Sequence, residues 1–141
     1  MGTVNLPSAV IDGRQHAAQR AAESMLRSLG TAEVSLRLAE PASGSVGSQL
    51  GLESPTMEDV PLCPAVVRYC AGPRETKARY EVILSSNSLK QAIAEYNVDD
   101  VDTWLLTAAG LVYRDTLLHI DMVMVEQFAG AEYLYRVFVT E

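Results

Sequence analysis

The densest run of apolar residues lies at the end of the chain, in residues 111–141, LVYRDTLLHIDMVMVEQFAGAEYLYRVFVTE. Two β-prone arms flank a short segment that contains Gly130, and this pattern predicts an antiparallel hairpin. Strict alternation along the first arm puts four apolar side chains on one face: Leu118, Ile120, Met122 and Met124. Both faces of both arms are largely apolar, so neither face is suited to water. We therefore expect residues 14–29, residues 97–110 or a neighbouring subunit to cover the face that the core leaves.

Three further strands are expected upstream of this hairpin. Residues 33–40, EVSLRLAE, alternate apolar and polar side chains and predict a strand with one buried face. Residues 60–71, VPLCPAVVRYCA, predict a single strand at a sheet edge or with a bulged start, because Pro61 and Pro64 cannot donate ladder hydrogen bonds. A turn at residues 72–75 then leads into KARYEVILSS, which predicts the partner strand of a second hairpin.

Three helices are predicted around these strands. The first covers residues 14–29, with Asp12 as its N-cap and Gly30 just beyond its end. Its apolar face is formed by Ala18, Ala22, Met25 and Leu29. Ser85 or Ser86 can cap a short helix that runs through Leu89, Ile93 and Tyr96. Asn97 can cap the last helix, which would carry Asp99 and Asp100 in its first turn and end at Gly110. The side chains on its inner face would be Val101, Trp104, Leu105 and Ala108.

A chain of 141 residues is long enough for one domain with a substantial core. We predict a single domain over residues 1–141, of the α+β class, built mainly as an antiparallel β-barrel or β-roll. Residues 1–30 form an N-terminal arm and helix, residues 31–40 and 60–141 form the β core, and the two short helices precede the C-terminal hairpin.

Residues 41–59, PASGSVGSQLGLESPTMED, are rich in glycine and serine and contain two prolines, and this composition predicts a long flexible loop. Its isolated apolar residues are Leu50, Leu52 and Met57. They can fold back onto the core as a lid, or they can become ordered only against a partner. Met122 and Met124 are the other candidate partner contacts, with core packing as the alternative, because methionine adapts to both environments.

The charge balance limits the classes of partner. The net charge is −7, and the eleven basic residues form no stripe, which argues against sequence-specific or backbone binding to the outside of nucleic acid. No run approaches the roughly 18 apolar residues of a membrane span. The N-terminus also lacks the basic and apolar regions of a secretory signal, so we expect a cytosolic protein. In that reducing compartment, Cys63 and Cys70 are expected to be buried thiols.

No catalytic constellation is recognisable in the sequence. His119 lies within an apolar strand pattern, where a structural role is more common than that of a general base. The acidic residues Asp99, Asp100 and Asp102 could attract a hard cation, but their spacing differs from that of a calcium loop and a helix start already explains them. The glycine-rich nucleotide motifs are lacking. We therefore predict no enzymatic activity, no cofactor and no metal site.

The order of predicted elements resembles the small head-tail connector proteins of long-tailed phages and their prophage relatives, the head-closure or stopper class. Three segments carry the resemblance, which covers residues 30–141: GSQLGLESPTMEDVPLCPAVVR, RYEVILSSNSLKQAI and HIDMVMVEQFAGAEYLYRVFVTE. The resemblance implies a compact β-barrel or β-roll subunit that assembles into a ring around the DNA channel, with the long loop projecting to the lumen or to the next ring. It implies no catalytic residues. The helix at residues 14–29 is less typical of the shortest members, which leaves the position in the neck open.

The leading hypothesis is thus a non-enzymatic phage or prophage assembly protein. It would form a homo-oligomeric ring between portal or adaptor and tail proteins, in the host cytoplasm during assembly and then in the virion neck. One alternative is a cytosolic small-molecule-binding or enzymatic β-barrel, with residues 41–59 as a lid and a pocket lined by polar groups such as His119. The other alternative is a tail-completion or tail-terminator protein.

Overall fold

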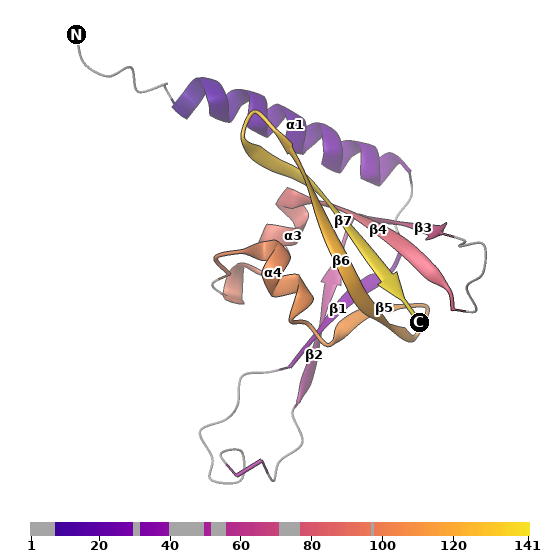
Figure 1. Cartoon of the computed structure of the whole chain (residues 1–141). Coiled ribbons are helices and arrows are strands. Elements are labelled where there is room, and N and C mark those ends of the chain that lie inside the picture. The colour runs from indigo at the N-terminus through magenta and orange to yellow at the C-terminus, as the bar shows by residue number, and fades with distance from the viewer. Residues whose placement is uncertain (1–7, 30–31, 40–49, 52–55, 71–76, 97) are drawn as a thin grey trace.

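The computed structural model describes residues 8–29, 32–39, 50–51, 56–70, 77–96 and 98–141. Figure 1 shows a long N-terminal helix beside one curled sheet, with short helices packed against it. In chain order the elements are α1 (Ser8–Ser28), β1 (Val34–Ala39), β2 (Met57–Leu62), β3 (Ala65–Cys70), β4 (Arg79–Ser85), α3 (Ser86–Ala92), η1 (Ala94–Tyr96), α4 (Val101–Leu106), β5 (Gly110–Tyr113), β6 (Thr116–Phe128) and β7 (Ala131–Thr140). The predicted α+β class and the helices before the C-terminal hairpin are confirmed.

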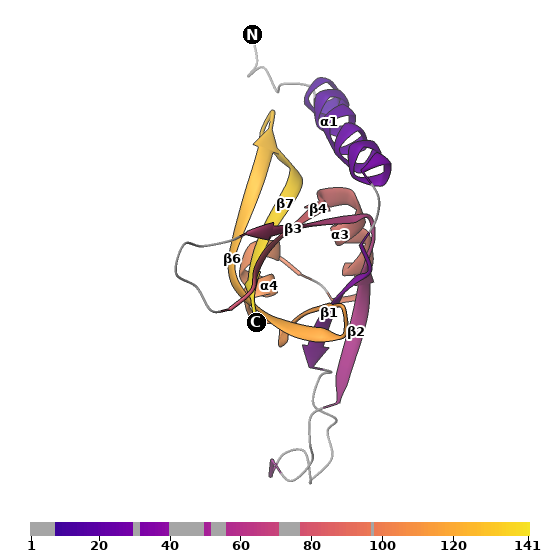
Figure 2. The ribbon, with the colours of Figure 1, turned by 90° about the vertical axis from the view of Figure 1, so that its right-hand side faces the viewer.

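The seven strands form one antiparallel sheet in the order β2-β1-β5-β6-β7-β4-β3. Only Cys63 and Pro64 separate the last residue of β2 from the first residue of β3. The sheet therefore curls until its two end strands meet at this corner, as Figure 2 shows from the side. No pairing between β2 and β3 occurs in the described part of the chain, so the sheet is open and the predicted closed barrel is not confirmed.

The core fills the inner side of the curled sheet. On β1 the buried side chains are Val34, Leu36 and Leu38, as the alternation predicts. The hairpin of β3 and β4 is also confirmed, with each β3 residue paired to β4. Helices α3 and α4 close the core from the inner side with buried Leu89 and Leu105, together with Ile93, the residue that follows α3.

Helix α1 begins at Ser8, so the predicted N-cap at Asp12 is wrong and that residue lies within the helix. The helix also packs on a different face from the one predicted. Its buried apolar residue is Leu26, whereas Met25 and Leu29 are 60% and 66% exposed. The reason is polar: the side-chain amides of Gln15 and Gln19 donate to backbone carbonyls of the hairpin, at 3.0 and 3.1 Å. With these bonds in place, the predicted apolar face of α1 lies beside the contact between the helix and the hairpin, and not within that contact.

Further predicted element boundaries are wrong, including the end of the last helix, which stops at Leu106, whereas Gly110 begins β5. The run at residues 60–71 forms two strands, because β2 ends at Leu62, before Cys63 and Pro64, and the chain turns there into β3. Helix α4 begins at Val101 with Asp100 at the N-cap position, so Asp99 and Asp100 precede the helix. Asn97, the predicted cap, lies outside the described residues. The cap predicted at Ser85 or Ser86 is confirmed at Ser85, whose Oγ accepts a hydrogen bond from the backbone of Ser88 at 3.2 Å.

The C-terminal region forms a three-stranded meander where the pattern predicts two arms. Residues 114 and 115 make a tight turn between β5 and β6, and residues 129 and 130 make one between β6 and β7. All four turn residues have positive φ, between 51° and 81°, as expected for the two-residue turns whose twist suits antiparallel hairpins. The first turn was missed because Arg114 and Asp115 lack the usual glycine.

Candidate functional site

A β-bulge in β6 decides which side chains face outward. Asp121 is an extra residue opposite β7, and the alternation of side chains shifts by one beyond it. Leu118 and Ile120 are therefore buried, whereas Met122 and Met124 are 48% and 40% exposed. The prediction that these four side chains share one face is wrong for this reason.

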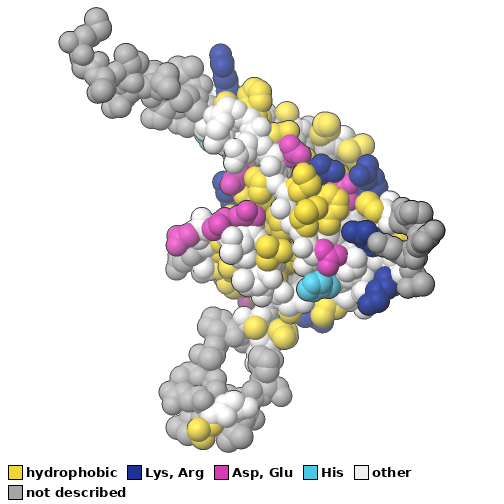
Figure 3. All heavy atoms as spheres, viewed as in Figure 1, with side chains coloured by type: hydrophobic (Ala, Val, Ile, Leu, Met, Phe, Trp, Pro, Cys, Tyr) yellow, Lys and Arg dark blue, Asp and Glu magenta, His cyan; other side chains and the backbone are white. Residues whose placement is uncertain are grey.

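The exposed methionines belong to what we call the outer sheet face, the side chains of β6, β7, β4 and β3 that point away from the core. The register places Met122 opposite Phe138, Phe138 opposite Glu81, and Glu81 opposite Arg68. Neither α1 nor α4 buries the two methionines. Figure 3 shows apolar side chains on this side of the molecule, interspersed with acidic and basic ones.

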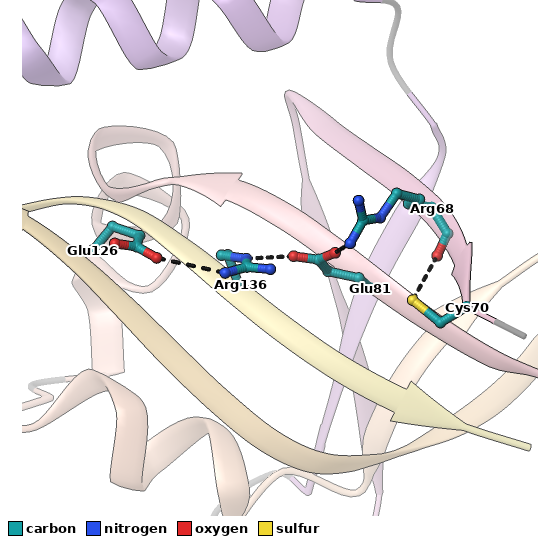
Figure 4. Close-up of polar contacts among 5 residues, drawn as sticks. All are labelled: Arg68, Cys70, Glu81, Glu126 and Arg136. Atoms are coloured by element: carbon teal, nitrogen blue, oxygen red, sulfur yellow. Dashed lines mark hydrogen bonds and ion pairs between the residues drawn. The ribbon is translucent and has the colours of Figure 1, made fainter. Parts of the chain in front are cut away.

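A row of ion pairs crosses the outer sheet face (Figure 4). Glu126 on β6 pairs with Arg136 on β7, with Oε1 and Nη1 3.6 Å apart. Arg136 also donates to Glu81 on β4, which accepts a second bond from Arg68 on β3. Glu81 is 1% exposed, and its two arginine partners satisfy both of its carboxylate oxygens. We call these four residues the charge row.

The charge row is also held by its surroundings. The hydrogen bond to Glu81 raises the pKa of Arg136. The same guanidinium lies 5.5 Å from the ring centre of Phe138, a cation–π contact. Next to Arg68, the thiol of Cys70 contacts the Arg68 carbonyl oxygen at 3.8 Å. The charge row therefore links the side chains of four neighbouring strands on the surface of the sheet.

A second apolar surface lies between α1 and the β6–β7 turn. Its groove has a volume of about 540 Å³, with Arg14 at one end, and is lined by Ala17, Ala18, Ala21, Ala22, Met25, Phe128 and Tyr133. Phe128 is 52% exposed. The apolar stripe that the sequence predicts for this helix thus lines the groove, while the helix docks through its glutamines.

A polar hollow of about 800 Å³ lies where α1, the α3–α4 connection and the β6–β7 turn meet. Glu132 is its best-connected residue: its carboxylate accepts from the hydroxyl of Tyr135 and lies 3.5 Å from the Lys90 ammonium. Its backbone carbonyl accepts from Ser86 and Gln19. Burial, together with the bond to Glu132, raises the pKa of Tyr135 well above its ordinary value. These contacts tie α1 and α3 to the hairpin.

The remaining predicted partner contacts lie elsewhere. Leu50 is 66% exposed, and Met57, which is 47% exposed, begins the edge strand β2. The predicted end of the loop at residue 59 is therefore wrong, because residues 57–59 pair with β1. In the strand order β2 is separated from β6 by β1 and β5, so the structure does not join Met57 to Met122 and Met124. Leu52 lies outside the described residues, as do most residues of the predicted loop at 41–59.

Sequence reasoning missed the charge row and the Phe128 side of the groove. Glu81, Arg136 and Arg68 stand far apart in the chain, and only the strand register brings them together. A signal was present, because each of these three charged residues has apolar neighbours on both sides within its strand. It could not be used without knowing which strands are neighbours.

The sequence offered His119 and the acidic residues at the start of α4 as candidate chemical residues. The side chain of His119 is 76% exposed, with Nε2 3.7 Å from Asp121 Oδ1, which does not fit the predicted deep pocket. A hydrogen bond between two carboxyls lowers the pKa of Asp100 and raises that of Asp102. Among the described residues, no group of three or more His, Cys, Asp or Glu side chains is arranged to hold a metal ion.

The cysteines differ from the prediction in one respect. Both thiols are free, but Cys63 is exposed and only Cys70 is partly buried. The reason is the position of Cys63 in the two-residue corner between β2 and β3, where the chain leaves the core.

Two further findings bear on function. Within the described part of the chain, no helix combines the length and apolar character needed to cross a membrane. Comparison of the chain with protein-family models, with curated proteins and with solved structures found no match.

Proposed function

We propose that this protein is a non-enzymatic virion assembly subunit of the head-tail connector type, which forms a ring between portal and tail. The observation that carries the proposal is the pair of exposed apolar surfaces, the outer sheet face and the groove along α1. A ring subunit contacts its two neighbours through two different patches of its own surface. A small acidic domain has no need of two such surfaces for its own stability.

The charge of the chain is in keeping with this role. A net charge of −7 discourages adhesion to DNA that passes close by, because the phosphates are repelled. The subunit is proposed to reside in the host cytoplasm during assembly and in the virion neck afterwards. The resemblance of residues 30–141 to stopper proteins supports the same assignment.

The decisive experiment measures the mass of the purified chain in solution, alone and mixed with a cognate portal or tail protein. The proposal predicts a ring-sized species with the portal or adaptor. A chain that binds neither portal nor tail protein would refute it. A species formed only with the tail tube would instead assign the chain to the tail-completion or tail-terminator class.

The polar hollow supports a second candidate, a small-molecule-binding or enzymatic domain. Its lining mixes the ammonium of Lys90 with the carboxylates of Asp99, Asp100 and Glu132, so a zwitterionic ligand would suit it best. A thermal-shift screen of amino acids and other zwitterions tests this candidate. A shift that is lost in Lys90→Met would support it, and the lack of any shift would count against it.

A further inference from the structure

The charges of the charge row alternate across four adjacent strands. In the order β6, β7, β4, β3 they are negative, positive, negative and positive: Glu126, Arg136, Glu81 and Arg68. Read from the other end, the order is positive, negative, positive and negative. A second copy that faces the first and is turned end for end therefore opposes every charge with its opposite.

The two ends of the row are the members that remain open to a partner. Glu81 is 1% exposed and fully hydrogen-bonded within its own chain. The side chains of Arg68 and Glu126, by contrast, are 64% and 39% exposed. In the end-for-end arrangement Glu126 meets Arg68 of the second copy, and the two-fold symmetry makes this contact twice.

By the usual rise and spacing of β-strands, about the same distance separates Met122 from each end of the row. Glu126 is four residues away along β6, or about 14 Å at the usual rise of a strand. Arg68 is three strands away in the same transverse row, also about 14 Å at the usual spacing. A two-fold axis that exchanges Arg68 with Glu126 therefore passes close to Met122. This exposed apolar side chain would meet its own copy on the axis.

We infer that the outer sheet face binds the outer sheet face of a second copy of this chain, around a two-fold axis near Met122. Met124 and Phe138 flank Met122 and add apolar contact, while the charge row sets the orientation. A different protein would need an unrelated surface with the same alternating charges. The second copy carries that surface by construction, because an isologous interface uses one patch on both subunits.

The pair forms between free subunits and does not require the proposed ring. It has a consequence that does rest on the proposed function: a face used in the pair cannot touch a ring neighbour at the same time. Pairing would then compete with ring assembly until binding to the portal or adaptor shifts the equilibrium from paired subunits to the ring.

The test measures the dissociation constant of the full chain by sedimentation equilibrium, using Met122→Glu, Met122→Lys and their equal mixture. Either variant alone places like charges together on the axis, and we expect its dissociation constant to rise at least about tenfold. The mixture places Glu against Lys and should restore the dimer as a one-to-one pair. Leu106→Glu is the matched control, because Leu106 is 51% exposed on α4, away from the outer sheet face, and should leave the dimer intact.

A second variant, Glu126→Arg, tests the ends of the row independently of the axis. It makes two like-charge contacts with Arg68 of the second copy, so we expect weaker pairing that recovers partly in high salt. The inference is overturned if the wild-type chain is still monomeric at roughly 100 µM protein. It is also overturned if the mixture of Met122 variants fails to pair. Neither result bears on ring formation with the portal, which the mass measurement with portal protein tests separately.

Discussion

Replacing Glu81 by Gln tests whether the charge row holds the sheet together. The substitution keeps the shape of the side chain and removes its charge. Glu81 is 1% exposed and accepts from both Arg68 and Arg136, so Gln offers one acceptor where two are needed and turns an amide donor toward a guanidinium. Breaking a buried pair by changing one member costs about 3–5 kcal/mol.

The expected loss for Glu81→Gln is below that range. The Arg68 side chain is 64% exposed, so it can turn to water once its partner is gone. We therefore expect a loss of about 2 kcal/mol in the free energy of unfolding, mostly from the buried position of residue 81. For a chain of 141 residues this corresponds to a fall of about 7 °C in Tm.

Urea denaturation followed by the fluorescence of Trp104, the single tryptophan, measures the loss. Protein concentration is held fixed, because any pairing of copies adds to apparent stability. Glu126→Gln is the matched control: it removes the exposed end of the same row and should cost less than about 0.5 kcal/mol. If both variants lose equally little, the charge row contributes no more than surface ion pairs, and the reasoning fails.

Three other perturbations test single features of the fold. Gly110→Ala should cost more than about 2 kcal/mol in urea denaturation, because a Cβ there would lie 2.5 Å from the backbone oxygen of Leu118; a neutral result would mean that β5 and β6 can separate freely. Ala129→Gly should raise the free energy of unfolding by about 0.5–1 kcal/mol, and Tm with it, because Ala129 has a φ of 53° in the β6–β7 turn. A lower stability would contradict the positive φ at this position. The folded pKa of Tyr135 is raised above its unfolded value near 10, so the unfolded chain loses that proton first and stability falls as pH rises above about 10. Tyr135→Phe should lessen this alkaline loss, and the difference in absorbance at about 295 nm between the two proteins should develop only as the chain unfolds.

Local patterns in the sequence were sufficient to predict the buried side chains wherever one face of an element is apolar and the other is polar. The alternation at residues 33–40 leaves only one way to bury Val34, Leu36 and Leu38, and the structure buries them. Ser85 caps its helix as predicted, since a cap depends only on residues within one turn. The tight turns and short spacing also predicted the hairpins of β3–β4 and β6–β7.

Tertiary structure decided the features for which local alternatives have similar energy. Both faces of β6 are apolar, so the sequence could not locate the bulge at Asp121 that turns Met122 and Met124 outward. The docked face of α1 depends on where the hairpin presents carbonyl groups to Gln15 and Gln19, which no helical periodicity contains. The charge row likewise exists only because β6, β7, β4 and β3 are neighbours in the sheet. The sequence by itself thus determined most strands and helices, while strand neighbours and their register determined the surfaces that they present, because those depend on contacts between residues distant in the chain.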